Sequence, residues 1–358
     1  MSIVPLYGHD ALRARLSSSI KRGTLPASLL LHGPRGVGKQ RLALWIAQSL
    51  VCAAPAADAT PCGRCQACRY ATSLGHPDVH WFFPRPRLET DATASEVMAD
   101  YADAIAERTK ASGLYAGSSG SEGIYVATVR AIVQAASVSP AMGPRKVFIV
   151  GDAESMVPQE GSDMAANALL KLLEEPPSNT FIILTSSEPG ALLPTIRSRV
   201  VNVRVAALPA HDVEAFLADA AVIDALKRSS KLSTAERVRA ANGAPGTLLE
   251  SRQRDVAVSG AERLLESALS GDRSKTIRAS MAQGSTRARG VFSDTLDELT
   301  ALLAVRARSA VARGDDAGAV GASRAIASVE QAKTLASGNV SPALITASLL
   351  RDLTSALT

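Results

Sequence analysis

A glycine-rich loop between an apolar run and a helical pattern is the feature that most constrains how this chain can fold. Residues 28–32 form a short apolar run, and residues 41–51 carry apolar side chains at helical spacing. Between them, residues 33–39 read Gly-Pro-Arg-Gly-Val-Gly-Lys. In such a loop the glycines let the backbone wrap a phosphate group, and the lysine contacts the outer phosphates. The sequence therefore predicts a strand, a phosphate loop and a helix; the alternative is a glycine turn that only connects strand to helix.

The loop departs from the full motif at one position. Gln40 stands where the motif requires serine or threonine, whose hydroxyl normally ligates Mg²⁺. A glutamine amide is longer and neutral, so metal placement is the step most affected, and nucleotide binding can survive while turnover is lost. The residues expected to bind ATP or ADP are Gly33, Gly36, Gly38, Lys39 and Gln40.

Length and net charge limit the classes of protein to which the chain can belong. The chain has 358 residues, enough for two or three domains, and a formal net charge of +5. This charge is compatible with nucleic-acid contact but modest for the length, and aromatic residues, at 4%, do not indicate a base-stacking surface. We find no apolar run of membrane-spanning length and no signal peptide, so we expect no membrane association and a cytoplasmic location.

The cysteines are concentrated in one short stretch after this helix: Cys52, Cys62, Cys65 and Cys68. Their spacing, with two overlapping Cys-x-x-Cys pairs, matches the ligand set of a tetrahedral Zn²⁺ site. Redox chemistry is the competing interpretation, but a redox pair needs no third and fourth cysteine nearby. His76 and His80 lie just beyond and are substitute ligands if a thiolate is not used. A closed four-thiolate site leaves no position for a substrate water, so we expect structural zinc.

A second buried-strand pattern, residues 146–150, is followed by an acidic residue. A phosphate-loop ATPase carries there the acids that hold Mg²⁺ and polarise water, but the pair that would read Asp-Glu reads Gly151-Asp152. Asp152 is a candidate for orienting a water molecule or for capping the next turn, and we expect Glu154 to be solvated. The sequence therefore lacks one of the two acids at Gly151-Asp152, just as it lacks the hydroxyl at Gln40, and both changes weaken Mg²⁺ binding.

Strand and helix patterns continue to alternate along the chain. A helix over residues 163–177 ends at two prolines, and apolar strands are expected over residues 181–185 and 201–205. Between these strands lies the pair Ser198-Arg199. This alternation predicts a parallel sheet covered by helices on both faces.

Taken together, these motifs resemble the bacterial DNA polymerase III clamp-loader subunits, a family of AAA+ proteins. The resemblance rests on the phosphate loop, the cysteine insert, the sequence Asn-Ala-Leu-Leu-Lys-Leu-Leu-Glu-Glu-Pro-Pro at 167–177 and the Ser-Arg pair, and it covers about residues 5–250. It is most similar to the delta prime branch, because the ATP-hydrolysing gamma/tau subunits keep the two positions that are altered at Gln40 and Gly151. The resemblance therefore implies a subunit that does not hydrolyse its own ATP.

The resemblance also implies an architecture. We expect an α/β AAA+ domain with a parallel sheet and the zinc insert (52–68) over residues 1–205, a helical lid over 206–252 and an all-α collar for oligomerisation over 253–358. Within the first domain, residues 84–123 are longer than the family pattern and are expected to form a surface insertion containing a helix over 95–110.

The lid should contain helices over 211–225 and 234–241, and the collar should be a helical bundle interrupted near residues 314–316 and 338–339.

The resemblance further implies partners. The subunit would join gamma/tau and delta subunits in a hetero-pentamer that uses ATP to load a sliding clamp onto primed DNA, within a DNA polymerase (nucleotidyltransferase) holoenzyme. In that ring the arginine of the Ser-Arg pair, here Arg199, reaches the ATP of the neighbouring subunit, where a permanently charged guanidinium stabilises phosphoryl transfer.

Two other interpretations remain open from the sequence. The first is an active gamma/tau-type ATPase that tolerates Gln40 and uses Asp152 as its acid. The second is a zinc-dependent nucleic-acid-binding protein, in which a fragment around residues 50–85 would bind DNA through the nearby cations Arg64, Arg69, Arg85 and Arg87.

Overall fold

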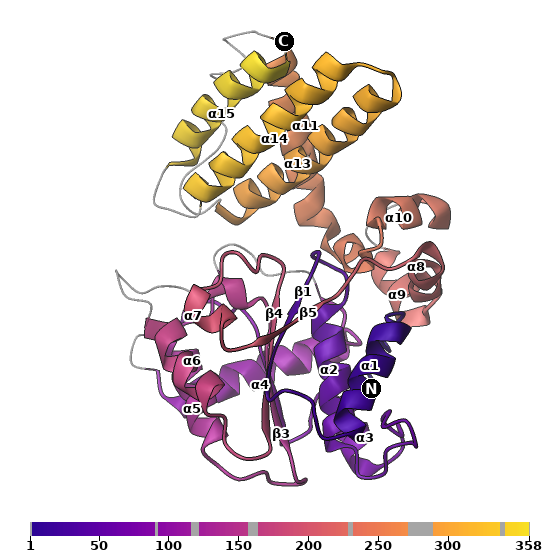
Figure 1. Ribbon diagram of the computed structural model, residues 1–358, viewed down its shortest axis with the longest axis vertical. Coiled ribbons are helices and arrows are strands. Elements are labelled where there is room, and N and C mark those ends of the chain that lie inside the picture. The colour runs from indigo at the N-terminus through magenta and orange to yellow at the C-terminus, as the bar shows by residue number, and fades with distance from the viewer. Residues whose placement is uncertain are drawn as a thin grey trace. The chain divides into compact units, whose positions relative to one another are not determined.

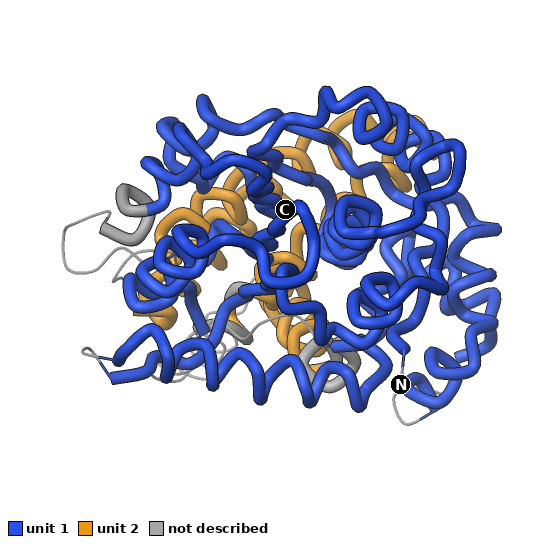
Figure 2. The backbone as a smooth tube through the Cα atoms, turned by 90° about the horizontal axis from the view of Figure 1, so that it is seen from below, with its two compact units in different colours: residues 1–117, 122–250 blue, residues 118–121, 251–358 orange. Residues whose placement is uncertain are grey.

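The computed structural model describes residues 2–89, 92–115, 122–156, 164–227, 232–270, 289–336 and 341–357. Those up to Glu250 form one compact unit and those from Ser251 onward form a second (Figure 2). Each unit buries its own set of hydrophobic side chains. Within the described ranges, every helix is too short or too polar to cross a membrane.

A parallel sheet lies at the centre of the first unit (Figure 1). Its five strands, counted over the described residues, are β1 (Ser28–His32), β2 (Val79–Phe82), β3 (Lys146–Val150), β4 (Thr180–Ser186) and β5 (Val201–Arg204). The order across the sheet is β2-β3-β4-β1-β5, so β1 is hydrogen-bonded on both sides. Strands buried on both faces are near-continuous apolar runs, as β1 and β3 are. The predicted parallel α/β sheet is confirmed.

Helices cover both faces of this sheet (Figure 1). One side carries α1 (Asp10–Lys21), α2 (Lys39–Val51) and α3 (Gln66–Thr72), and the other carries α5 (Val126–Ala136), α6 (Met164–Glu174) and α7 (Pro194–Arg197). Because all strands are parallel, the carboxyl ends of β1, β3 and β4 lie at one edge of the sheet. The phosphate loop, Asp152 and Ser187 follow these three strands and therefore meet there.

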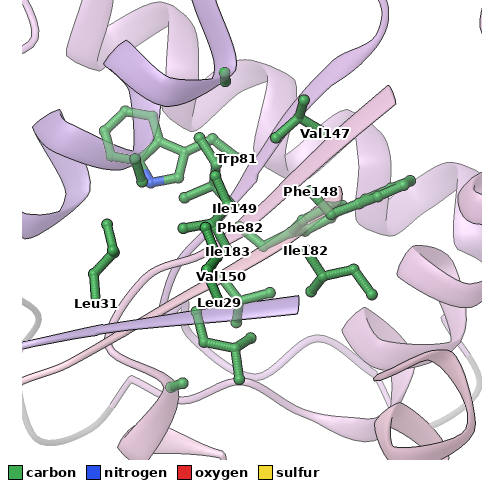
Figure 3. Packing of buried hydrophobic residues seen from close by; sticks show 14 of the residues in the cluster. Leu29, Leu31, Trp81, Phe82, Val147, Phe148, Ile149, Val150, Ile182 and Ile183 are labelled. Carbon is green, nitrogen blue, oxygen red and sulfur yellow. The ribbon is translucent and has the colours of Figure 1, made fainter. Parts of the chain in front are cut away.

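The stretch expected as a surface insertion also contributes to the main core. It contains α4 (Ala94–Lys110), which starts at a capping box: Thr93 Oγ1 accepts the Glu96 N–H, and the Glu96 carboxylate accepts the Thr93 N–H. The side chains of Val97, Tyr101 and Ala104 are buried from one face of α4. They join the packed strand residues that Figure 3 shows around Phe82 and Phe148.

A smaller core lies where the chain leaves the sheet. The helices there are α8 (Ala210–Leu217), α9 (Ala220–Leu226) and α10 (Thr234–Ala241), followed by the 3₁₀ segment η2 (Pro245–Glu250). The helical stretch expected over 211–225 forms as two helices, because α8 ends at Leu217 and Asp219 caps α9 by accepting the Ala221 N–H at 2.9 Å. Apolar residues of α8 and α9 pack against Val4 from the N-terminal segment.

The second unit is a bundle of four described helices, α11 (Ser251–Ser270), α13 (Arg289–Ala312), α14 (Asp316–Ala336) and α15 (Pro342–Leu357). Leu264, Leu299, Val329 and Leu353 of these helices are each at most 1% exposed and share one core. The expected interruption at 314–316 lies between α13 and α14, where Gly314 has a φ of 71°. The interruption expected at 338–339 falls outside the described residues.

Candidate functional site

The predicted phosphate loop joins β1 to α2. Gly36 and Gly38 have φ values of 76° and 97°, a conformation that a side chain disfavours, and Gly38 immediately precedes α2. A Cβ on Gly36 would lie 2.6 Å from the backbone nitrogen of Thr247. The Gly246 N–H donates to the Gly36 carbonyl at 2.9 Å, so η2 rests directly on the loop. The local backbone therefore requires glycine at both positions.

The lysine of the loop is fully engaged by its own chain. Lys39 Nζ donates to the carbonyls of Gly33 and Pro34 and to Ser187 Oγ, each at 2.9 Å. An ammonium group has one N–H for each of these acceptors. Lys39 is only 5% exposed, and burial lowers its pKa while the charges of Asp152 and Glu154 oppose that shift. A phosphate group would have to replace one of these acceptors to bind Lys39.

Gln40 is held at both ends of its side-chain amide. Its Nε2 donates to Asp152 Oδ2 at 3.0 Å, and its Oε1 accepts the indole N–H of Trp81 at 2.9 Å. Mg²⁺ requires oxygen ligands in near-octahedral geometry, whereas an amide N–H group faces the acid here. The residues around Asp152 therefore do not fit Mg²⁺.

The second departure from the ATPase pattern is sterically linked to the first. A Cβ on Gly151 would lie 2.5 Å from Gln40 Cδ and 2.7 Å from Gln40 Nε2. The amide is buried and hydrogen-bonded on both sides, so it cannot move aside without losing those bonds. The side chain of Gln40 thus occupies the space that an acidic residue at 151 would need.

We expect Gly151→Ala to lower the free energy of unfolding by about 1–3 kcal/mol, because the added methyl displaces the Gln40 amide. Urea unfolding of the full chain measures this, with Gly143→Ala as control, since nothing lies within 4 Å of a Cβ at Gly143. In a double-mutant cycle with Gln40→Ser, the cost of Gly151→Ala should largely disappear. Additive free energies would show that the two positions are independent.

Residues that the sequence analysis did not single out hold the Trp81 indole in place. The Arg108 guanidinium carbon lies 4.5 Å from the ring centroid of Trp81, 3.2 Å from that of Phe83 and 3.8 Å from that of Tyr115. Trp81 and Tyr115 also contact each other edge to face, with centroids 5.5 Å apart. Burial among these rings lowers the pKa of Arg108 to about 10. Arg108 and Tyr115 belong to the expected insertion, which therefore braces the group that binds Gln40.

Glu154 is half-buried and its carboxylate points inward rather than into solvent, so that expectation is wrong. Its Oε1 accepts the Ser187 N–H at 2.8 Å, and its Oε2 is buried without a hydrogen-bond partner among the described residues. Burial, reinforced by the negative charge of Asp152, raises the pKa of Glu154. The edge of the sheet thus holds two acids, Asp152 and Glu154, beside Lys39.

The four cysteines converge. Their Sγ atoms all lie within 4.8 Å of one another, and within the described residues they form the one group of metal-ligand type that meets this distance. The Sγ atoms of Cys52 and Cys65 are 3.9 Å apart and those of Cys62 and Cys68 are 4.0 Å apart. Zinc–sulfur bonds of about 2.3 Å in tetrahedral geometry place the sulfurs about 3.8 Å apart. The cluster therefore fits Zn²⁺, and His76 and His80 are not part of it.

Short local contacts bring these thiols together. The backbone N–H groups of Cys62, Cys65 and Cys68 donate to the sulfurs of Cys52, Cys62 and Cys65 respectively, each at 3.4 Å. Cys65 is also the N-cap of α3, and Gly63 turns the chain with a φ of 70°. N–H groups directed at sulfur favour the thiolate form that binds metal.

Arg199 lies directly after α7 and is far from the phosphate loop in sequence. Its Nε donates to Glu174 Oε1 at 2.6 Å, and a second guanidinium nitrogen forms an ion pair with the same oxygen. The remaining nitrogen donates to the Thr195 carbonyl at 2.8 Å and to Ser198 Oγ at 3.3 Å. Its side chain is 31% exposed, so the group is accessible at the surface.

The sequence matches a family of replication proteins. Residues 8–209, more than half of the chain, match the family described as DNA polymerase III, delta subunit. The chain belongs to this family. The matched range contains the phosphate loop, the cysteine cluster and Arg199.

Relatives include both kinds of subunit. The chain is 35% identical to DNA polymerase III subunit delta' of Pseudomonas aeruginosa over 173 residues, 48% of this chain and 41% of that protein. It is 31% identical to subunit gamma/tau of Mycobacterium tuberculosis over 219 residues, 61% of this chain and 31% of that protein. It is 28% identical to subunit delta' of Escherichia coli K12 over 185 residues, 52% of this chain and 44% of that protein. The chain spans less than half the length of these relatives.

Among solved structures, a gamma subunit-related protein from Thermotoga maritima aligns with 96% of this chain and 100% of its own. The two sequences are 16% identical, and the TM-score is 0.44.

Proposed function

We propose that this chain is a clamp-loader subunit of the delta prime type, which does not hydrolyse ATP itself and supplies Arg199 to a neighbouring ATPase subunit. The observation that carries this proposal is the Gln40 amide, held between Asp152 and Trp81 where a hydrolysing site would hold Mg²⁺. Without a metal to neutralise charge on the phosphates, phosphoryl transfer at this loop would be slow.

The state of the lysine supports the same conclusion. Lys39 satisfies its donors within the chain and is buried beneath the loop. Nucleotide binding would therefore compete with an intact hydrogen-bond network, so ATP or ADP would bind weakly at most. Zn²⁺ at the cysteine cluster would be structural, since four thiolates close its coordination shell.

Family membership supports the proposed partners. Subunits named delta' and gamma/tau are relatives of this chain. We expect it to assemble with gamma/tau and delta subunits and, through that complex, to act on a sliding clamp and primed DNA. The second unit, a helical bundle, would serve as the collar of the assembly, and the helices around residues 206–252 as its lid.

The test is the DNA-stimulated ATP turnover of the complex reconstituted with its partner subunits. Lys39→Ala in this chain should change turnover by less than about twofold, because the loop does not take part in hydrolysis. The matched control is the phosphate-loop lysine of the gamma/tau partner, whose replacement by alanine should remove most turnover. If Lys39→Ala removes a share of turnover, and the isolated chain hydrolyses ATP, then this chain is an active gamma/tau-type ATPase.

One observation bears on the nucleic-acid alternative. Arg85 makes a bidentate ion pair with Asp100, at 2.9 and 2.8 Å, and the guanidinium of Arg87 lies 5.9 Å from the Tyr125 ring centroid. Both cations thus contact residues outside the cysteine fragment. Two of the four cations near the cysteines are thus engaged within the intact chain, which supports a structural role for the zinc over DNA binding.

A further inference from the structure

The guanidinium of Arg199 is turned back onto its own chain. All of its nitrogens contact atoms of the same subunit: Nε and one terminal nitrogen face Glu174, and the other terminal nitrogen faces Thr195 and Ser198. The contact with the Thr195 carbonyl spans four residues and folds the side chain over the end of α7. The Arg199 guanidinium is therefore paired with a carboxylate of its own subunit rather than directed away from it.

The groups that hold Arg199 are anchored by the core. Glu174 is the last residue of α6, where Leu172 and Leu173 are 7% and 3% exposed, and the chain then continues through two prolines. Thr195 lies in α7, whose Ile196 is 1% exposed. The backbone at both ends of the contact is therefore fixed, while the two side chains themselves remain at the surface.

We propose that Glu174 is a positioning residue that latches Arg199 in the free subunit, and that the phosphates of the neighbour's nucleotide must displace it. This inference rests on the proposed function, because it requires Arg199 to act on a neighbouring ATP. Glu174 neutralises the same charge that the transferring phosphoryl group needs. A polyphosphate offers several charged acceptor oxygens to the guanidinium, whereas Glu174 contacts it through one.

The solvent exposure of the Arg199–Glu174 ion pair determines how strongly it can change the ATP dependence of turnover. The side chains of Arg199 and Glu174 are 31% and 45% exposed, and ion pairs at such positions are weak. A weak ion pair leaves Arg199 free of Glu174 in part of the subunits. The ATP concentration for half-maximal turnover then rises in proportion to one divided by that free fraction. When ATP is bound, its several charged oxygens outcompete the single exposed carboxylate of Glu174, so Arg199 is engaged in either case. The latch therefore affects the apparent affinity and leaves the maximal rate nearly unchanged.

The experiment compares Glu174→Gln with Glu175→Gln in the reconstituted complex. Both variants remove one negative charge, and Glu175 is the adjacent exposed residue. We expect Glu174→Gln to lower the ATP concentration for half-maximal DNA-stimulated turnover by about two- to fivefold relative to Glu175→Gln, with the maximal rate unchanged. Raising the ionic strength should shrink this difference, since salt screens an exposed pair. Glu174→Asp keeps the charge on a shorter side chain and should lower that ATP concentration less than Glu174→Gln does.

The possible results separate the latch from the proposed function. A maximal rate that falls in Glu174→Gln as it does in Arg199→Ala would mean that Glu174 aligns Arg199 for reaction, and would overturn the latch alone. Identical saturation curves for Glu174→Gln and Glu175→Gln would do the same. An effect of Glu174→Gln that persists when Arg199 is alanine would also overturn it. If Arg199→Ala itself leaves turnover unchanged, both the proposed function and the latch are wrong.

Discussion

Arg199→Ala in this chain is expected to lower ATP hydrolysis at the neighbouring site of the reconstituted complex by about 10³-fold, which removes that site's share of DNA-stimulated turnover. The physical reason is that a guanidinium supplied from the adjacent subunit stabilises negative charge on the transferring phosphoryl group. Steady-state turnover with DNA, measured at saturating ATP, gives the effect directly.

Two matched variants show whether the loss is specific. Arg197 lies two residues earlier, at the end of α7, so Arg197→Ala removes an equal charge and should leave turnover nearly unchanged. Arg199→Lys keeps the charge but not the planar fork of donors, and should recover only a small part of the rate. Size-exclusion chromatography of each complex must show intact assembly. Full turnover by an assembled Arg199→Ala complex would rule out the trans role.

Cys68→Ser is expected to abolish Zn²⁺ binding and to lower the free energy of unfolding of the first unit by about 4 kcal/mol or more. Cys68 is 0% exposed and is the buried member of the cluster. The loop from 52 to 65 contains no helix or strand, so the metal would supply much of what holds it together. Helix α3, which carries Cys68, also supports the N-terminal segment, because the Ile3 N–H donates to the Thr72 carbonyl at 2.9 Å.

The measurements are zinc content per chain after dialysis and thermal unfolding with and without a chelator. The unaltered chain should bind one zinc ion and lose stability on chelation, and the variant should show neither property. Cys52→His exchanges one zinc ligand for another, and it should retain more metal than Cys68→Ser. Equal stability of the unaltered chain with and without metal would show that the cysteines pack without needing zinc.

The sequence predicted the local structure around the phosphate loop. The strand, loop and helix around Lys39 were predictable, since glycine placement and apolar periodicity act within a few residues. The convergence of the cysteines was predictable for the same reason, because three of them lie within seven residues and cap the turn that joins them. That Gln40 would weaken a metal site was also evident from its position in the motif.

The tertiary structure alone decided how that weakened site is filled. Gln40 contacts Trp81 and Asp152, which lie 41 and 112 residues further along the chain, and no local pattern records those pairings. The contact between Arg108 of α4 and the Trp81 ring was not predictable for the same reason, since the packing of α4 depends on the strand that it meets.

The sequence by itself determined the parallel α/β fold, the position of the phosphate loop and the residues of the cysteine cluster. These depend on spacing and periodicity, which are properties of short segments. Only the tertiary structure decided that Lys39 satisfies its donors internally, that Gly151 leaves room for the Gln40 amide and that Glu174 holds Arg199. Each of these involves at least one contact between residues far apart in the sequence, such as Lys39 with Ser187, and such distances exist only after the sheet has assembled.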